Sequence, residues 1–305
     1  MSDLAAEFEK SRRRLFGLAY RMLGSAADAE DIVQETFLRA REMSADELRS
    51  PEAYFVTIAT RLCLDELKSA RKKRETYVGP WLPEPIVDVE GISPENAMEY
   101  ADDLSFALLL TLEKLTPPQR AAFLLHDVFD TPFPTIAAAL DKSESACRQL
   151  ASRARRMVRE MKPARRVAPD AHAALLMKFT EAAATGDPKN LEALLAEDAV
   201  AWSDGGGLKL AALNPICGAG KVARYLTGLA SKAARRGGMP SFRLMAVNGA
   251  PAFLLYINDA LDQTLAIETD GAKIIAVFMV RNHEKLSCVA ASVKAAGADR
   301  AEAAT

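Results

Sequence analysis

Arginine supplies most of the chemistry that residues 142–166 of this chain offer. Nine lysines and arginines in this stretch are opposed only by Glu144 and Glu160. A guanidinium group pairs with the edge of guanine and a glutamine amide with that of adenine, so Arg148 and Gln149 could read bases. The other arginines suit phosphates, which supply affinity without sequence information. The chemistry predicted here is nucleic-acid binding rather than that of a merely solvated basic face.

The elements around these arginines predict a helix-turn-helix. A short helix, a turn and a longer helix fit residues 136–162. The longer helix carries an apolar seam made by Cys147, Ala151, Ala154 and Val158. Its outward face near the N-terminal half is the part that enters the major groove in such motifs. The candidate DNA contacts on that face are Ser145, Arg148, Gln149, Ser152, Arg153 and Arg156.

Catalytic and metal-binding patterns are weak in this sequence. The three histidines, His126, His172 and His283, are scattered, and the four cysteines include no Cys-x-x-Cys pair. Asp204, close to Trp202, is the acid most worth weighing as a pocket residue, but no histidine pairs with it in the sequence. The pattern favours a structural role instead, in which Asp204 caps the glycine-rich loop that follows it. We therefore expect no catalytic residue, no bound metal and no cofactor.

An acidic ridge marks the first helical region. Ser25 to Asp28 has the pattern of a helix start, and the following helix buries an apolar stripe. Asp28, Asp31 and Glu35 share a different face, because they are spaced at i, i+3 and i+7. Taken alone, this ridge is a solvated surface.

The next helix combines an aromatic ring with cations. It is expected to begin at Ser50 and Pro51, a cap and a first-turn proline. Bases of single-stranded DNA stack on rings while phosphates meet cations, although a plain surface helix fits the same pattern. The candidates on its polar face are Tyr54, Arg61, Asp65, Lys68, Arg71 and Arg74.

Composition and charge bound the class of protein. The chain has 305 residues, is 50% apolar and 26% charged, and carries a net charge of −2, as expected for a multi-domain globular protein. Residues 1–10 are acidic and polar rather than basic and then apolar, so we expect neither a signal peptide nor a membrane span. Widely spaced cysteines favour the reducing cytoplasm.

The charge distribution separates the domains. The segment between the two helical regions is acidic, and three prolines in residues 77–85 predict a stiff, non-helical start to it. After residue 170 two short helices precede strand-like runs with Asn-Gly and Asp-Gly turns, which indicates an α+β fold. The predicted boundaries are a helical domain at 1–75, an acidic linker at 76–103, a helix-turn-helix domain at 104–166, an α+β domain at 170–293 and a frayed tail at 294–305.

The two helical modules together resemble regions 2 and 4 of group 4, extracytoplasmic-function (ECF), sigma factors of the sigma-70 family. Residues 29–37 resemble the helix that docks on the β′ clamp helices of RNA polymerase, and residues 51–74 resemble the segment that melts and captures the −10 element. Residues 115–120 and 136–156 resemble the reader of the −35 element. The resemblance implies contacts with the polymerase core, including its β subunit, and with promoter DNA. The implied core-binding residues are Asp28, Asp31, Gln34 and Glu35.

A narrower resemblance covers nearly the whole chain. Residues 81–85, 204–207 and 281–286 look like the motifs of the subgroup that carries a C-terminal SnoaL-like domain, a cone-shaped α+β fold. This resemblance implies that the fused domain replaces a separate anti-sigma factor. The implied regulatory contacts are Trp81, Leu82, Pro83, Asp204, Gly205, Gly206, Gly207, Asn282, Lys285 and Leu286.

The functional hypothesis is a sigma factor that directs promoter recognition and is modulated by its fused C-terminal domain. Two alternatives remain at this point. One is a helix-turn-helix regulator with a ligand-sensing domain, which would not need the acidic ridge or the Tyr54 face. The other is a SnoaL-like enzyme fused to DNA-binding helices, whose turnover would depend on Asp204.

Overall fold

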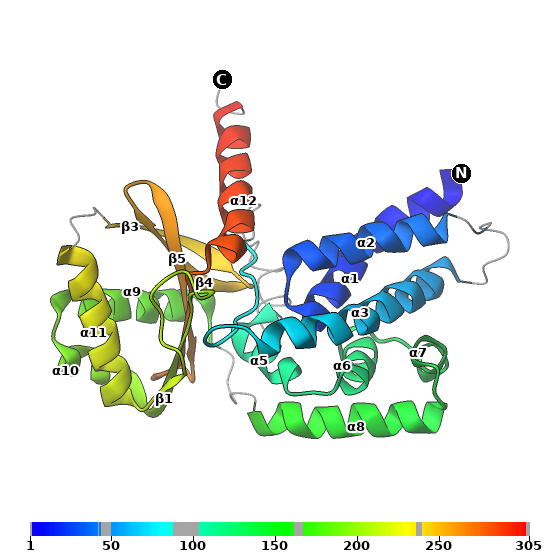
Figure 1. Ribbon diagram of the computed structural model, residues 1–305, viewed down its shortest axis with the longest axis horizontal. Helices are drawn as coiled ribbons and strands as arrows, with labels where there is room; N and C mark the ends of the chain where they lie inside the picture. Colours follow the sequence, from blue (N-terminus) through cyan, green and yellow to red (C-terminus); the bar gives the residue numbers. More distant parts are fainter. Residues whose placement is uncertain are drawn as a thin grey trace. The chain divides into compact units, whose positions relative to one another are not determined.

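The computed structural model describes residues 2–41, 43, 50–87, 104–161, 167–235 and 240–302 (Figure 1). The chain forms two compact units. The first comprises Met1–Thr76 and Leu108–Lys162, and the second comprises Tyr77–Ala107 and Pro163–Thr305. Both helical modules thus belong to one unit, while the linker residues belong with the C-terminal domain.

Three helices build the N-terminal part of the first unit: α1 (Ser2–Leu23), α2 (Ala26–Ala40) and α3 (Pro51–Glu75). Helix α2 begins where predicted, because the hydroxyl of Ser25 accepts a hydrogen bond from the Asp28 amide at 3.1 Å. This contact satisfies a backbone donor that the helix itself leaves unpaired. The apolar faces meet in a core that includes Leu15, Leu18, Val33, Phe55 and Ala59.

The second helical module contains α5 (Phe106–Glu113), α6 (Pro117–Phe123), a π-helical turn η2 (Leu124–Val128), α7 (Phe133–Leu140) and α8 (Glu144–Met161). Asp141 ends α7 with a φ of 52° and turns the chain toward α8. The predicted helix-turn-helix is therefore confirmed. The apolar seam is confirmed too, because Cys147, Ala151 and Ala154 are fully buried and Val158 nearly so.

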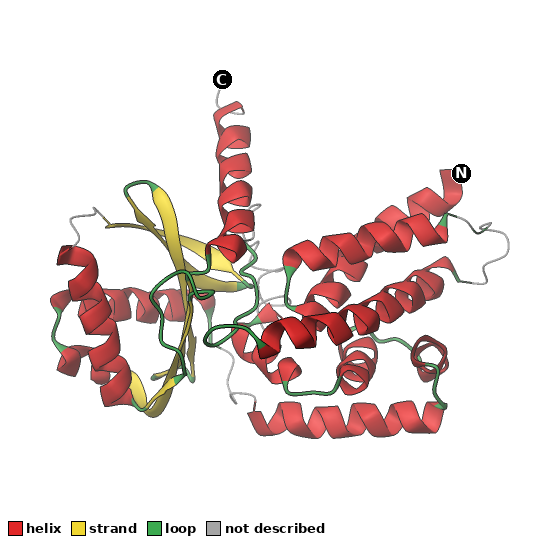
Figure 2. Ribbon diagram, in the orientation of Figure 1, coloured by secondary structure: helices red, strands yellow, loops and turns green. Residues whose placement is uncertain are grey.

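The second unit is built on a six-stranded sheet (Figure 2). Its helices are α9 (Pro169–Thr185), α10 (Pro188–Glu192), α11 (Ala219–Arg235) and α12 (His283–Glu302). Its strands are β1 (Leu195–Asp204), β2 (Ile216–Cys217), β3 (Pro240–Val247), β4 (Ala250–Ile257), β5 (Ala260–Thr269) and β6 (Ile274–Val280). The order across the sheet is β2-β1-β6-β5-β4-β3, with β1 and β6 parallel and the other pairs antiparallel. The predicted α+β class is confirmed.

The two faces of this sheet bury different partners. One face, with Val277 and Met279, joins the core formed with α9, α10 and α11. Phe278 points to the other face, because successive side chains of a strand alternate. There the ring of Phe106, the first residue of α5, stacks on Phe278 at 5.4 Å between centroids. Phe106, which belongs to the second unit, thus packs on the sheet face opposite the helical core.

Some local predictions were wrong. The helical spacing of Leu191, Leu194 and Leu195 predicts one helix that holds all three, but α10 ends at Glu192 and β1 begins at Leu195. Helix α12 continues past Lys294 to Glu302. The helical spacing of Phe55, Ile58, Ala59 and Leu62 predicts a buried stripe on α3, but Ile58 and Leu62 are only half-buried.

Candidate functional site

Helix α8 presents its polar face to solvent. All six candidate DNA contacts on this helix, Ser145, Arg148, Gln149, Ser152, Arg153 and Arg156, are exposed. The guanidinium of Arg148 pairs with Glu144 at 2.8 Å and lies 4.4 Å from the centre of the Phe133 ring. Exposed pairs of this kind are weak, so the side chain is free to exchange partners.

The C-terminal half of α8 concentrates positive charge. Arg155, Arg156 and Arg159 line a surface hollow together with Ser152 and Glu160. Arg155 forms an ion pair with Asp127 of the π-helical turn η2, with 2.5 Å between Nε and Oδ1. A hollow lined by guanidinium groups attracts anions such as phosphate.

The candidates on α3 fall into different settings. Tyr54 is half-buried, and Asp65 and Lys68 form an exposed ion pair at 2.7 Å. Arg61 instead reaches the C-terminal end of α7, where it donates to the carbonyl of Ala138 at 2.7 Å and to that of Ala139 at 3.4 Å. Two further candidates, Arg71 and Arg74, belong to α3, but their side chains lie outside the described residues.

Two arginines, the buried Arg120 and the half-buried Arg14, join the two helical modules within the first unit. Arg120, 3% exposed, donates to the carbonyl of Met22 and pairs with Glu113 at 2.8 Å. Arg14 donates to the carbonyl of Phe129. Charged groups are costly to bury unless they are paired, so these contacts fix how the two modules meet.

The acidic ridge lies on α2, as predicted from its spacing. Asp31 and Gln34 are exposed, whereas Asp28 and Glu35 are half-buried. Glu35 pairs with Arg39 one turn later at 2.7 Å. The ridge offers acidic groups to a basic partner at the surface of the first unit.

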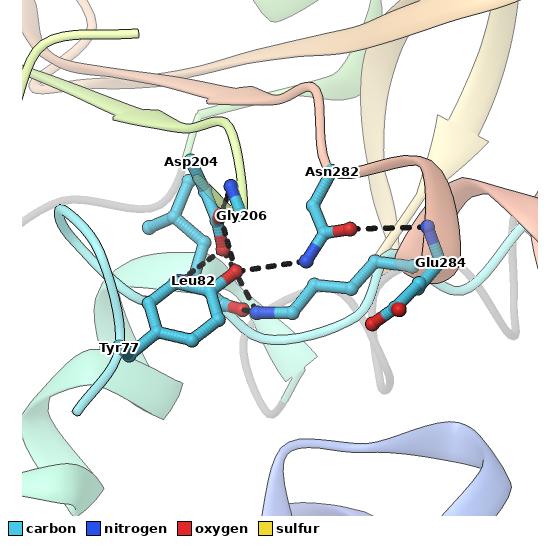
Figure 3. A network of polar contacts seen from close by, with 7 residues as sticks. Tyr77, Leu82, Asp204, Gly206, Asn282 and Glu284 are labelled. Atoms are coloured by element: carbon cyan, nitrogen blue, oxygen red, sulfur yellow. Dashed lines mark hydrogen bonds and ion pairs between the residues drawn. The ribbon is translucent and has the colours of Figure 1, made fainter. Parts of the chain in front are cut away.

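A buried network centred on Asp204 joins the linker to the C-terminal domain (Figure 3). Asp204 ends β1 and is 0% exposed. Its Oδ2 accepts from the Leu82 amide at 2.9 Å and from Lys285 Nζ at 2.8 Å. Its Oδ1 accepts from the hydroxyl of Tyr77 at 2.6 Å and from the Gly206 amide at 3.0 Å. We call these four contacts, together with those of Asn282 and Lys285 given below, the Asp204 network.

Asn282 and Lys285 complete this network from the start of α12. The side-chain amide of Asn282 donates to the Tyr77 hydroxyl at 2.8 Å, and its Oδ1 accepts from the Glu284 amide at 3.0 Å. Lys285 also donates to the Leu82 carbonyl at 2.5 Å, and its Nζ lies 4.3 Å from the centre of the Trp81 ring. The ammonium group is thus enclosed by a carboxylate, a carbonyl and an aromatic ring.

Gly206 is required by the close approach of Asn282. Its φ is +61°, and a Cβ at this position would lie 2.5 Å from Asn282 Nδ2. Gly205 is as restricted, since its Cβ would lie 2.3 Å from the Lys209 carbonyl oxygen. The glycine-rich run therefore brings the loop against the network, as well as allowing the turn.

Burial and charged partners together set the direction in which the pKa values of Tyr77 and Asp262 move. Burial raises the pKa of Tyr77, and the hydrogen bond to the Asp204 carboxylate raises it further, so the phenol stays a donor. Burial alone would raise the pKa of Asp262, but the hydrogen bond from Lys209 and the charge of Arg281 outweigh it and lower that pKa. Both groups keep the protonation state that their partners need near neutral pH.

The arrangement around Asp204 suits structure rather than acid-base chemistry. Both carboxylate oxygens accept hydrogen bonds from the protein, and the residue presents no surface to a substrate. Within the described ranges, no group of three or more His, Cys, Asp or Glu side chains could hold a metal ion. No described helix is long and apolar enough to cross a membrane.

The structure brings together most of the regulatory candidates. Trp81, Leu82, Asp204, Gly206, Asn282 and Lys285 all meet in the Asp204 network. Pro83 and Leu286 are buried, and each directly follows a residue of the network in the sequence. Gly207 lies close to the Val78 side chain of the linker. Tyr77 was missed by the sequence analysis. Its only signal was an aromatic residue directly before the proline-rich segment.

Two family matches cover the helical modules. Residues 8–73 match Sigma-70 region 2, and residues 105–158 match Sigma-70 region 4. These ranges contain the acidic ridge, the α3 face and the α8 face. A match to region 2 is not expected of a simple helix-turn-helix regulator or of an enzyme fused to DNA-binding helices, so neither alternative is favoured.

Relatives of known class match over much longer stretches. The ECF RNA polymerase sigma factor SigJ of Mycobacterium tuberculosis is 42% identical over 229 residues, which cover 74% of this chain and 73% of SigJ. The probable ECF sigma factor SigI of the same organism is 32% identical over 281 residues, covering 91% and 92% of the two chains. The chain therefore belongs to the ECF sigma factors of the sigma-70 family.

A solved structure agrees with this assignment. The crystal structure of Mycobacterium tuberculosis SigJ matches with a TM-score of 0.75 and 34% identity, over 93% of this chain and 98% of that one. The likeness extends through the C-terminal α+β domain, since the match covers nearly the whole of both chains. Membership in this family indicates a transcription factor rather than an enzyme.

Proposed function

We propose that the protein is a promoter-specificity subunit of bacterial RNA polymerase that acts in the cytoplasm and is regulated by its own C-terminal domain. The exposed face of α8 would read the −35 element as duplex DNA. The polar face of α3 would hold the opened −10 strand, and the acidic ridge of α2 would dock on the clamp helices of β′. The protein would have no active site and would take no cofactor.

The observation that carries the regulatory part of this proposal is the Asp204 network. It uses Tyr77, Trp81 and Leu82 of the linker and buries the Asp204–Lys285 ion pair. In the polymerase complex the acidic linker would instead extend through basic channels as a phosphate mimic. The same residues cannot serve both arrangements, so the C-terminal domain would act in place of a separate anti-sigma factor.

The position of Arg61 supports a second restraint within the first unit. Its guanidinium, a candidate for the −10 strand, is occupied by the Ala138 and Ala139 carbonyls of α7. Separating the two helical modules would free it. Binding to polymerase and exposure of the −10 face would therefore be coupled.

Reconstituted transcription tests this function. Full-length protein and a chain ending at residue 166 are each added to core polymerase with a library of promoters. Transcripts that start at defined promoters only when either form is present are the expected result. If neither form binds the core enzyme or starts transcription, the proposed function is wrong.

A further inference from the structure

The turn between β3 and β4 buries an asparagine. Asn248 and Gly249 form this turn with φ values of 53° and 77°, a conformation in which asparagine and glycine are favoured. Asn248 is nevertheless only 2% exposed. A buried side-chain amide is costly unless its donor and its acceptor are both satisfied. Its partners therefore show what the turn is built to hold.

One set of partners lies before the acidic part of the linker. The backbone N–H of Asn248 donates to the Ile86 carbonyl at 2.8 Å, and the backbone N–H of Ile86 donates to the side-chain oxygen Oδ1 of Asn248 at 3.0 Å. The adjacent Val87 forms an antiparallel bridge with Val247 at the end of β3. Residues 86 and 87 thus add a short strand contact to the sheet edge.

The other partner lies after the acidic part. The Nδ2 atom of Asn248 donates to the Leu104 carbonyl at 3.0 Å. Two residues later Phe106, 3% exposed, stacks on Phe278 of the sheet. A single side-chain amide therefore binds the chain at two points that are eighteen positions apart in the sequence.

We propose that Asn248 is a clamp that holds both ends of the segment between the two DNA-binding modules. Fully extended, the segment between Ile86 and Leu104 would span roughly 60 Å. The clamp keeps both ends within hydrogen-bond reach of one amide group. It opposes extension of the linker separately from the Asp204 network, which holds residues 77–82. This inference rests on the proposed function, because extension along the polymerase is what the clamp would restrain.

Hydrogen exchange of the free, full-length protein tests the clamp. Asn248→Gly keeps a backbone that tolerates positive φ but removes both side-chain bonds. Asn258→Gly is the matched control, since Asn258 has a φ of 51° in the β4–β5 turn at the other end of β4. We expect exchange at residues 86–87 and 104–107 to be about tenfold faster in Asn248→Gly and unchanged in the control. Equal exchange in Asn248→Gly and wild type would overturn the inference.

Folding is checked in the same data through the amides of β5 and β6. If Asn248→Gly disturbs these strands, Ile86→Pro replaces it, because proline removes the donor to Asn248 Oδ1 and leaves the sequence of strands β3 to β6 unchanged. The same increase at residues 104–107 is then expected. No increase there would contradict a shared clamp.

Transcription separates the clamp from the proposed function. With core polymerase and a matched promoter, Asn248→Gly is expected to yield several-fold more transcript than wild type, and Asn258→Gly the same amount as wild type. Equal yields from Asn248→Gly and wild type would refute the regulatory role of Asn248 alone. Absence of transcript from every form, including the chain ending at residue 166, would refute the sigma-factor function, while hydrogen exchange still decides whether the clamp exists.

Discussion

Charged side chains are used in opposite ways by the Asp204 network and by helix α8. In the network Asp204 is fully buried, and both of its oxygens are bonded to the protein. On α8 the Arg148–Glu144 pair has side chains that are 57% and 46% exposed. Desolvated pairs resist exchange with water or with new partners, whereas exposed pairs exchange readily. Burial therefore separates the residues that hold a conformation from those kept available for a ligand.

The largest effect is expected from breaking the network at its centre. Asp204→Ala would leave the Lys285 ammonium group buried without a counter-charge, at a cost of about 3–5 kcal/mol in the free energy of unfolding. Urea unfolding followed by tryptophan fluorescence measures this, because both tryptophans, Trp81 and Trp202, belong to the second unit.

Two variants sharpen that experiment. Asp65→Ala removes an exposed partner of Lys68 and should cost no more than about 1 kcal/mol in the free energy of unfolding of the first unit, which is followed by far-UV circular dichroism because that unit contains no tryptophan. Adding Lys285→Met to Asp204→Ala should recover part of the loss, because the uncompensated charge is gone. A loss for Asp204→Ala as small as that for Asp65→Ala would mean that burial of the pair does not set its strength.

A smaller and more specific effect is expected at the N-terminal half of α8. Arg148→Ala should reduce discrimination at one base pair of the −35 element by about 1–3 kcal/mol, because a bidentate contact is lost. Binding of holoenzyme to duplexes that differ at single positions measures this. Arg224→Ala, on the exposed surface of α11, is the control. Equal loss on every duplex would assign Arg148 to phosphates instead.

Further along α8, Arg156→Ala should weaken binding to all sequences by a similar factor. Loss of one phosphate contact should reduce the slope of log affinity against log salt by about 1. Titrations at several salt concentrations on matched and unrelated duplexes give this slope. A loss confined to the matched duplex would show that Arg156 reads bases.

The smallest effect is expected from His172 on α9. Burial lowers the pKa of its imidazole, so the folded protein binds a proton less readily than the unfolded chain. The stability that this provides is complete above the unfolded pKa of about 6.5 and is lost as pH falls toward the lowered folded value. His172→Gln should therefore reduce the fall in unfolding free energy between pH 7.5 and 5.5. An unchanged fall would exclude His172 as its source.

Local sequence rules predicted much of the second unit because the relevant forces are local. Apolar and polar residues alternate along the strands, and the turns fall at Asn248-Gly249 and Asp270-Gly271. The cap at Ser25 also forms as expected, since its hydroxyl accepts from the Asp28 amide, and Asp187 caps α10 in the same way.

The connections of the site could not be predicted in the same way. Tyr77 meets Asp204 across 127 positions, and Arg61 meets Ala138 across 77. Neither contact leaves a periodic signal, because each depends on how whole elements pack. The resemblance to a subgroup indicated the Asp204 and Lys285 motifs, but it did not indicate that they form a single ion pair.

The parallel pairing of β1 with β6 has a consequence for the order in which parts of the protein can fold during synthesis. Strand β6 lies between the β2-β1 pair and the β5-β4-β3 meander, so the sheet stays in two halves until this last strand emerges from the ribosome. Asn282 and Lys285 follow directly after it. At typical synthesis rates, the DNA-binding helices leave the ribosome roughly 6–25 s earlier. In each new molecule the helical modules are thus complete for a brief interval before the Asp204 network can form.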